Sequence, residues 1–225
     1  MIIAIDGPSG AGKSTLGKML AEKLGLLYLD TGAMYRAAAL AAVQRGVDLS
    51  NAEAIANIAA TANIQLHGQP DSMTIILDGK DVSTEIRTQE IAEAASVVST
   101  ISEVRRVMVE QQRKLGESSA TGCVLEGRDI GSVVFPNADL KFFITATPEA
   151  RARRRYEQDM HQGRRATYER TLAEITQRDE RDVSRSDSPL TIAPDSVVID
   201  SSDLNLDEVL DQMLAAAHRT KGESA

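Results

Sequence analysis

Lys13 stands in a glycine-rich segment whose residue types and spacing are suited to holding phosphate groups. Residues 7–14 read Gly-Pro-Ser-Gly-Ala-Gly-Lys-Ser and fit the pattern G-x-x-x-x-G-K-[ST] at every position. Glycines allow backbone N–H groups to curl around phosphate oxygens, and a helix that follows adds its positive amino-terminal end. Lys13 is expected to reach the outer phosphates of a nucleoside triphosphate, and the Ser14 hydroxyl to hold Mg²⁺. The residues expected to bind the triphosphate are Gly7, Pro8, Ser9, Gly10, Ala11, Gly12, Lys13, Ser14 and Thr15.

A phosphate-binding loop names a ligand and not a reaction, because GTPases, ATPase motors and small-molecule kinases share it. Arginines that follow two expected strands narrow the choice. Arg36 comes just after the strand expected at 26–30, and Arg128 just after the one at 123–126. For either residue alone, a surface ion pair is the commoner explanation. Together at the carboxyl edge of one sheet, they suit a second phosphate-bearing ligand and charge neutralisation in phosphoryl transfer.

Further arginines gather late in the chain. Arg178, Asp182 and Arg185 are spaced i, i+4, i+7, which places them on one face of a helix. A second set, at positions 151, 154 and 155, shares a face of the helix expected at 148–161. Each set suits a solvated helix with ion pairs, or a mobile lid that covers the triphosphate and excludes water.

The elements that must position these residues alternate between strands and helices. Short apolar runs predict strands at 2–6, 26–30, 123–126, 140–145 and 196–200. Helical periodicity predicts helices over 14–24, 34–45, 52–62, 88–115, 148–161, 168–181 and 206–219. A Pro/Gly turn between two extended runs predicts an antiparallel hairpin within 63–81. This pattern is typical of an α/β fold with a parallel sheet covered on both faces.

Composition excludes several classes of protein. The 225 residues carry a formal net charge of −8, which argues against nucleic-acid or membrane-surface binding. Cys123 is the one cysteine, so the chain has no intramolecular disulfide and no multi-cysteine metal site. No stretch approaches the ~18–20 apolar residues of a membrane span. We expect a cytoplasmic, monomeric protein without nucleic-acid or membrane partners, and a polar tail at 221–225 that frays.

Several blocks of sequence, in the same order along the chain, resemble those of the bacterial cytidylate (CMP/dCMP) kinases, which are P-loop nucleoside monophosphate kinases. The blocks are Ile5–Thr15, Leu29–Arg36, Asp81–Ser83, Glu85–Thr88, Glu126–Gly131, Val133–Pro136 and Arg178–Asp182. The Gly-Arg-Asp and Glu-Ile-Arg-Thr blocks are much more specific than the phosphate loop. One departure is Glu126, which stands where many relatives carry aspartate and leaves any metal-binding role there open.

The resemblance implies a three-layer nucleoside monophosphate kinase fold. Its features are a five-stranded parallel core sheet, a small antiparallel β insert in the monophosphate-binding region and a short helical lid. Residues 1–225 would form a single domain. Its parts would be a core at about 1–32, 119–150 and 186–222, a monophosphate-binding region at about 33–118, and a lid at about 151–185.

The resemblance also implies roles for individual residues. The acceptor would be contacted by Thr31, Tyr35, Arg36, Ser96, Arg105, Arg128, Asp129, Arg178, Asp182 and Arg185. Three arginines (Arg36, Arg128 and Arg185) would bind its phosphate and, with Lys13, carry catalysis. Arg178 and Asp182 would bind the ribose, and Tyr35 would pack beside the acceptor. The cytosine ring would be contacted by Ser96, Arg105 and Asp129.

The last assignment has a physical rationale. Cytosine presents acceptors at O2 and N3 and a donor at N4, whereas uracil reverses the polarity of the last two. Because arginine only donates and ionised aspartate only accepts, Arg105 and Asp129 would leave uracil with two mismatches. For Asp129, an ion pair with Arg128 or bonds to nearby backbone amides are the alternative.

The sequence therefore predicts transfer of a phosphoryl group from ATP, with Mg²⁺, to CMP or dCMP. No covalent protein intermediate is needed, because the acceptor is already an anionic oxygen. A kinase for another small acceptor, such as UMP or AMP, remains an alternative. A nucleotide-dependent regulatory switch is another, although the chain has no Asn-Lys-x-Asp guanine motif.

Overall fold

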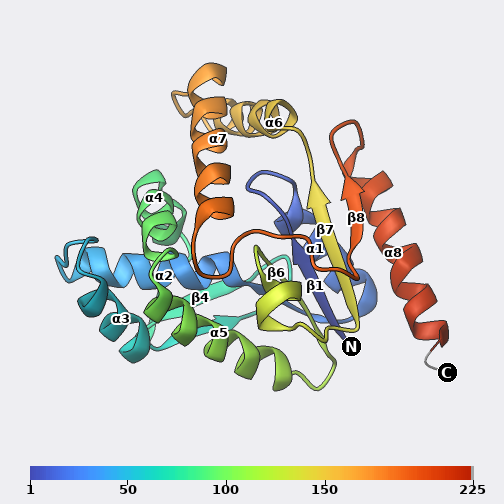
Figure 1. Cartoon of the computed structure of the whole chain (residues 1–225), viewed down its shortest axis with the longest axis horizontal. Helices are drawn as coiled ribbons and strands as arrows, with labels where there is room; N and C mark the ends of the chain where they lie inside the picture. The colour runs from blue at the N-terminus through green and yellow to red at the C-terminus, as the bar shows by residue number, and fades with distance from the viewer. Residues whose placement is uncertain (224–225) are drawn as a thin grey trace. The chain divides into compact units, whose positions relative to one another are not determined.

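A parallel sheet forms the centre of the fold, and the computed structural model describes residues 1–223 (Figure 1). Its five strands have the order β2-β6-β1-β7-β8. Their bounds are β1 Ile2–Asp6, β2 Leu27–Asp30, β6 Cys123–Gly127, β7 Leu140–Thr145 and β8 Val197–Asp200. β7 pairs in parallel with both β1 and β8. The α/β fold class and all five expected strands are confirmed, with ends shifted by one residue at most.

The central strands are apolar on both faces because helices cover them. In β7, Leu140–Ile144 are buried without alternation, the pattern of a strand between two layers. α1 (Lys13–Leu24) packs against β1, and α8 (Leu206–Glu223) packs against β7 and α1. α8 runs along the sheet in Figure 1. The helix continues to Glu223, and 224–225 lie outside the described residues, so the fraying expected at 221–225 stays a prediction.

The remaining helices follow the expected periodicity closely. Their bounds are α2 Thr31–Gln44, α3 Ala52–Thr61, α4 Gln89–Val98, α5 Ser102–Glu117, α6 Pro148–His161 and α7 Tyr168–Ser184. α2 begins three residues earlier than expected because the Asp30 carboxylate accepts the Ala33 N–H and caps the helix. α7 runs one turn further than expected, to Ser184.

The single helix predicted over 88–115 is wrong. The chain breaks between α4 and α5, where Ser99 and Thr100 turn their hydroxyls back onto the carbonyls of Ser96 and Val97. Hydroxyls that bond to the local backbone compete with helical continuation. The break separates Ser96 and Arg105, which lie on different helices.

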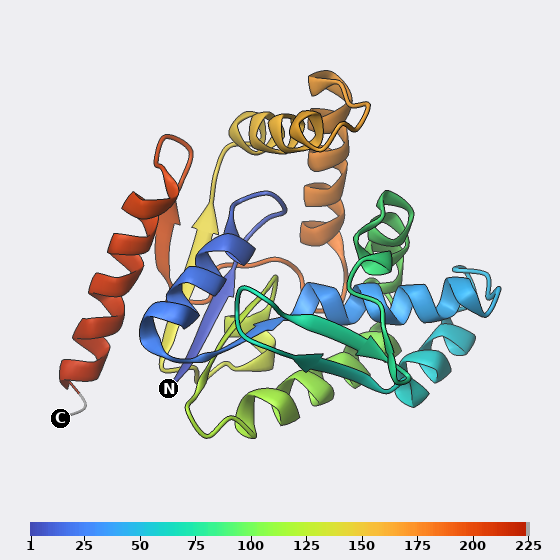
Figure 2. The same cartoon turned by 180° about the vertical axis from the view of Figure 1, so that it is seen from behind.

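The insert is larger than the expected hairpin. It forms a three-stranded antiparallel sheet with the order β3-β4-β5, and Figure 2 shows its two long strands side by side. The strands are β3 Ile64–His67, β4 Thr74–Leu77 and β5 Lys80–Asp81. Asp78 and Gly79 both have positive φ, the conformation of a tight two-residue hairpin turn. The Asp-Gly pair is a known signal for this turn, so the third strand was readable from the sequence.

Two short helical turns also lie outside the expected elements. η1 is a 3-10 turn at Glu85–Arg87. η2 is a π turn at Ile130–Val134, directly after Arg128 and Asp129. Single π turns are rare and often found at functional sites. No helix among residues 1–223 is both long enough and apolar enough to cross a membrane.

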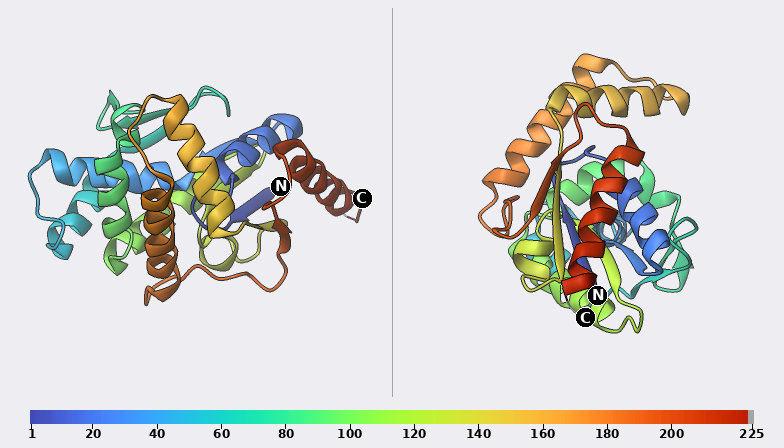
Figure 3. Two further views of the ribbon diagram at one scale, coloured as in Figure 1. Left: turned by 90° about the horizontal axis from the view of Figure 1, so that it is seen from above. Right: turned by 90° about the vertical axis from the view of Figure 1, so that its right-hand side faces the viewer.

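The chain divides into two compact units. The first unit contains residues 1–25 and 124–225, and the second unit contains residues 26–123. In the first unit, α6 and α7 pack against each other as a helical pair (Figure 3). In the second unit, α2 is surrounded by α3, α4 and the three-stranded sheet.

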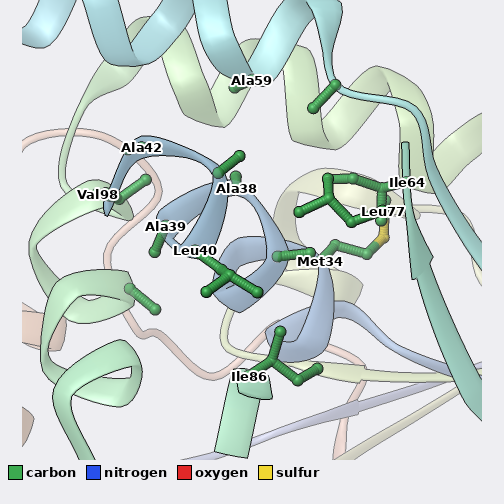
Figure 4. Packing of buried hydrophobic residues seen from close by; sticks show 14 of the residues in the cluster. Met34, Ala38, Ala39, Leu40, Ala42, Ala59, Ile64, Leu77, Ile86 and Val98 are labelled. Atoms are coloured by element: carbon green, nitrogen blue, oxygen red, sulfur yellow. The ribbon is translucent and has the colours of Figure 1, made fainter. Parts of the chain in front are cut away.

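Alanines allow the close packing around α2 (Figure 4). Ala38, Ala39 and Ala42 are completely or almost completely buried. Their small side chains leave room for larger neighbours such as Met34 and Ile86. A helix that is apolar nearly all round is buried on all sides, as α2 is.

Ile55 of α3 tests this core, because its side chain is completely buried in the second unit. We expect Ile55→Ala to lower the free energy of unfolding by about 2–5 kcal/mol, the range for truncating a large buried aliphatic side chain. The exposed neighbour Asn57 supplies the control Asn57→Ala, which should change stability little. Urea denaturation measures both, and equal midpoints for the two variants would contradict the packing described.

Candidate nucleotide-binding site

The phosphate loop connects β1 to α1, and its glycines are required by its geometry. A Cβ on Gly7 would overlap the carbonyl oxygen of Ile144 on β7. Gly10 and Gly12 have φ of 80° and 90°, which side chains strain. Lys13 is 5% exposed, and its Nζ donates to the Pro8 carbonyl at 2.8 Å across the loop. The loop thus holds Lys13 at the start of α1, where the helix end favours anions.

Arg151 of α6 bonds directly to this loop. Its guanidinium donates to the carbonyl of Ser9 at 3.0 Å and to that of Ala146 at 2.9 Å. It also makes a two-pronged ion pair with Asp179 of α7, at 2.6 and 3.1 Å. The Arg151 side chain is 3% exposed. Sequence reasoning placed Arg151 among the arginines of a solvated helix or a lid, and it missed the bond to Asp179 because that bond joins two helices.

The first unit contains a cluster of three arginines, Arg128, Arg178 and Arg185, which surround the carboxylate of Asp182. We call it the arginine cluster. Arg128 Nε donates to Asp182 Oδ2 at 2.7 Å. Arg185 approaches Asp182 Oδ1 to 3.9 Å, and its Nε donates to the Ser188 carbonyl at 2.6 Å. Burial alone would raise the pKa of Asp182, but the positive charges of Arg128, Arg178 and Arg185 outweigh it and lower that pKa. Asp182 is therefore a carboxylate that holds the cluster together.

The same cluster acts electrostatically on Lys13. Burial, and then the charges of Arg128 and Arg178, lower the pKa of Lys13 to about 7. The carboxylates of Glu126 and Asp6 act in the opposite direction without offsetting these effects. Cations held this close in a buried place favour an anionic ligand, because such a ligand removes their repulsion.

Asp129 lies at the start of the π turn, between Arg128 and Ile130. It is 5% exposed, and its backbone carbonyl accepts the N–H groups of Val133 and Val134. The neighbouring Arg128 makes an ion pair with Asp182 of α7.

In the second unit, Asp30 positions Arg36. One carboxylate oxygen of Asp30 caps α2, and the other accepts from the Arg36 guanidinium at 2.9 Å. A Cβ on Gly32 would lie 3.3 Å from that guanidinium and 3.2 Å from the Asp30 carboxylate. Gly32 therefore gives Arg36 room to fold back onto the first turn of α2. Thr31 is buried in the same turn.

Tyr35 and Arg105 also meet within the second unit. The Arg105 guanidinium lies 5.5 Å from the centre of the Tyr35 ring, a cation–π distance. Arg105 is 2% exposed, and it donates to the Ser99 carbonyl at the break between α4 and α5. Ser96, near the end of α4, is also buried. The geometry brings together Arg105 and Tyr35, both of which the resemblance places at the acceptor.

The structure thus brings together residues that are distant in the sequence, within each unit. The first unit joins Lys13 to the arginine cluster, and the second joins Tyr35 to Arg105. The expected convergence of Arg36 with Arg128 and Arg185 stays a prediction. Sequence reasoning assigned no role to Asp6, Asp30 or Asp179, although they lie within the matching blocks, because each holds another residue of the site in place.

Few side chains in the described part of the chain could bind a metal ion, and this fits an ion that arrives already bound to a nucleotide. Among residues 1–223 no three His, Cys, Asp or Glu side chains are grouped to hold a metal. Ser14 is exposed in the first turn of α1, next to Lys13, and Glu126 is buried close enough to act on the Lys13 pKa. Mg²⁺ commonly takes one or two protein ligands and completes its shell with phosphates and water. The donors present fit that pattern.

Comparison with known proteins agrees along nearly the whole chain. The family model described as cytidylate kinase matches residues 3–219. The cytidylate kinase of Caldanaerobacter subterraneus subsp. tengcongensis is 48% identical over 222 residues, which cover 98% of this chain and 96% of that protein. Cytidylate kinase 1 of Haemophilus influenzae is 48% identical over 219 residues, with 97% and 94% covered.

A solved structure agrees at the level of the fold alone. Shikimate kinase from Bacteroides thetaiotaomicron is 13% identical and superposes with a TM-score of 0.50, covering 97% of this chain and 98% of that one. The full-length matches in sequence go further than this likeness. With a phosphate loop, a buried lysine and an arginine cluster in place, the chain belongs to the cytidylate kinase family.

Proposed function

We propose that the chain transfers the γ-phosphoryl group of ATP to CMP or dCMP, which yields ADP and CDP or dCDP. Membership of the cytidylate kinase family supports this reaction. The observation that carries it is the arginine cluster whose charges act on Lys13 in the first unit. A protein that only hydrolyses or senses a triphosphate does not need this second group of cations, whereas a second phosphate-bearing reactant does.

Catalysis in this proposal consists of alignment and charge neutralisation. Lys13 and the backbone of the phosphate loop hold the donor phosphates. Mg²⁺, held by the Ser14 hydroxyl and phosphate oxygens, would screen the charge of the triphosphate. An oxygen of the acceptor phosphate attacks the γ-phosphorus directly, so the protein supplies no nucleophile and no covalent intermediate forms.

Arg128 is prepared for the acceptor phosphate by its bond to Asp182. Because Asp182 holds Nε, the outer nitrogens of the guanidinium are kept for a ligand, apart from a long 3.4 Å bond to the Gly127 carbonyl. A guanidinium fixed in advance loses little freedom when it binds a phosphate. Arg185 and Arg36 would share the acceptor phosphate, and Arg178 and Asp182 the ribose.

We further propose that Asp129, Arg105 and Ser96 read the cytosine ring, with Thr31 and Tyr35 beside the acceptor. All five are at least partly buried. Buried hydrogen-bonding groups reject a ring of the wrong polarity strongly, because their own bonds would go unmade.

With these roles, we propose that the chain has three regions. The parts at about 1–32, 119–150 and 186–222 would form the core of a single domain, 33–118 the monophosphate-binding region, and 151–185 the lid. A cytoplasmic location and a monomeric state stay predictions.

An acceptor panel tests the reaction. We expect ADP release from ATP to require CMP or dCMP, and kcat/KM with UMP or AMP to be lower by about 10²-fold or more, since mismatched groups would be left unpaired. A coupled assay of ADP release measures all four acceptors. Equal rates with UMP or AMP would contradict the base reading, and ADP release without any acceptor would favour a hydrolysing switch.

Arg128 tests the acceptor site. We expect Arg128→Ala to lower kcat/KM for CMP by ~10²–10⁴-fold, the range for removing one positioned charge from a transition state. Arg170 of α7 supplies the matched control, because its side chain is 73% exposed and forms an ion pair with Glu174 one turn along the same helix. Arg170→Ala should keep the parental rate. An unchanged rate in folded Arg128→Ala would remove Arg128 from the site.

The donor site can be tested by measuring whether Lys13 takes up a proton when a nucleotide binds. Because the pKa of Lys13 lies at about 7, much of the side chain is neutral in the free protein above that pH. A triphosphate favours the charged form, so binding takes up a proton and weakens as pH rises through this value. Calorimetry with a non-hydrolysable ATP analogue, in two buffers of different ionisation enthalpy, measures the uptake.

The control for this measurement is Lys13→Gln, in which no side-chain proton can be gained. We expect weaker binding by this variant and no difference between the two buffers. Identical enthalpies in both buffers for the parent protein would show that Lys13 is fully charged before the nucleotide arrives.

A further inference from the structure

The side chain of Asp6 links two parts of the first unit. One is β1, which leads into the phosphate loop, and the other is the π turn that follows Arg128 and Asp129. Asp6 is the last residue of β1 and is 4% exposed. Its two carboxylate oxygens accept the backbone N–H groups of Ile130 at 2.8 Å and of Gly131 at 2.7 Å. Both bonds span more than a hundred residues of sequence and fall within the first unit.

The segment that Asp6 holds has an uncommon backbone. The carbonyl of Asp129 accepts from both Val133 and Val134, and the carbonyl of Ile130 accepts from Phe135. These bonds close the π turn from within, but they leave the first N–H groups of the turn without a partner inside it. Asp6 supplies the missing acceptors, and it does so at the point where the chain leaves Arg128 and Asp129.

A second residue, Lys141 of β7, packs against the same turn beside Asp6. A Cβ on Gly131 would lie 3.0 Å from Lys141 Cδ and 3.3 Å from Asp6 Oδ2. Lys141 cannot easily give way, since its Nζ donates to the Pro136 carbonyl at 2.5 Å and to Asp195 at 2.7 Å. Side chains of β1 and β7 therefore clamp the turn, and Gly131 is the residue that permits their close approach.

Keeping a carboxylate here is energetically unfavourable. Burial raises the pKa of Asp6 to about 6, although the bonds from Gly131 and Ile130 act to lower it. Asparagine has nearly the same shape and no buried charge, but only one oxygen to accept two N–H groups. A costly charge retained at a buried position suggests a task that the uncharged residue performs less well.

We infer that Asp6 is a positioning residue for the acceptor: its carboxylate fixes the turn after Arg128 and Asp129 and thereby sets acceptor binding and the choice of base. The inference rests on the proposed function, in which these two residues contact the acceptor. The phosphate loop has a separate support, because the backbone of Asp6 is registered against Phe143 in the sheet. The side chain of Asp6 therefore positions the residues proposed to bind the acceptor, whereas its backbone supports the loop that binds the donor.

Two variants loosen the clamp in different ways. Asp6→Asn removes one accepting oxygen and the charge, whereas Gly131→Ala forces the turn away and leaves the charge of Asp6 intact. We expect each to lower kcat/KM for CMP by ~10–100-fold, the scale of a misplacement of about 1 Å at a reacting group. The ratio of kcat/KM for CMP to that for UMP should fall as well. KM for ATP should change little.

Asp139 provides the matched control. It is an exposed aspartate whose carboxylate also accepts one backbone N–H of β1, from Ile2 at the far end of the strand. Asp139→Asn should keep the parental kinetic constants.

The pH profile of the CMP-to-UMP ratio adds a readout that a purely structural role would not move. The charged groups that face Asp6 are Asp129, which raises its pKa, and Lys13, which lowers it. Protonated Asp6 has one oxygen fewer to accept with, so the parental ratio should fall as pH drops through about 6. Because CMP and UMP share the titration of their phosphate, it cancels in the ratio. In Asp6→Asn the ratio should be low and flat.

Stability separates positioning from folding. A raised pKa means that Asp6 stabilises the fold below its ordinary pKa and that this contribution is lost as pH rises through about 6. Asp6→Asn should therefore keep its Tm above pH 6 while it loses activity with CMP. A Tm that falls in step with the activity, while Gly131→Ala behaves as the parent, would overturn the inference.

Two other outcomes are also decisive. If Asp6→Asn raises only KM for ATP, Asp6 acts on the charge of Lys13 and the clamp is not what matters. If the parent protein itself shows no acceptor-dependent ADP release, the proposed function has failed. Parental activity with CMP together with unchanged kinetics in both variants would defeat the inference alone.

Discussion

Repulsion between buried cations is the constraint on which the first unit depends. Burial first, and then the nearby charges of Arg128 and Arg178, lower the pKa of Lys13 to about 7, in surroundings where charges are poorly screened. Three carboxylates, Asp6, Glu126 and Asp182, offset part of this charge. A triphosphate and a second phosphate would complete the compensation. The free protein is thus held in an arrangement that nucleotides complete.

The carboxylates that provide this balance also determine geometry. Asp182 holds Arg128 in place through one bond from Nε. Asp6 fixes the π turn. Asp30 caps α2 and also accepts a bond from Arg36. In each case one acidic side chain joins a functional cation or its loop to a regular element of the fold. Rigid elements support the site because helices and strands move less than loops.

The sequence predicted the elements well where local signals decide them. Apolar runs located all five core strands, and helical periodicity gave the bounds of α6 as the structure has them. It failed where side chains act over a distance or against periodicity. The hydroxyls of Ser99 and Thr100 interrupt a pattern that reads as one helix. The bond between Arg151 and Asp179 joins two helices through residues that look solvent-exposed in isolation. Motif matching locates residues that touch ligands, but it does not show those that hold them in place.

The bonds of Arg151 have a mechanical consequence for the α6–α7 pair. One buried guanidinium ties the base of α6 to the Ser9 carbonyl of the phosphate loop and to Asp179 of α7. The far end of the pair, at residues 162–167, is mostly exposed and joined by an irregular segment. The pair is therefore fastened at its base, so a displacement of α6 at Arg151 would be transmitted to the phosphate loop and to α7 together.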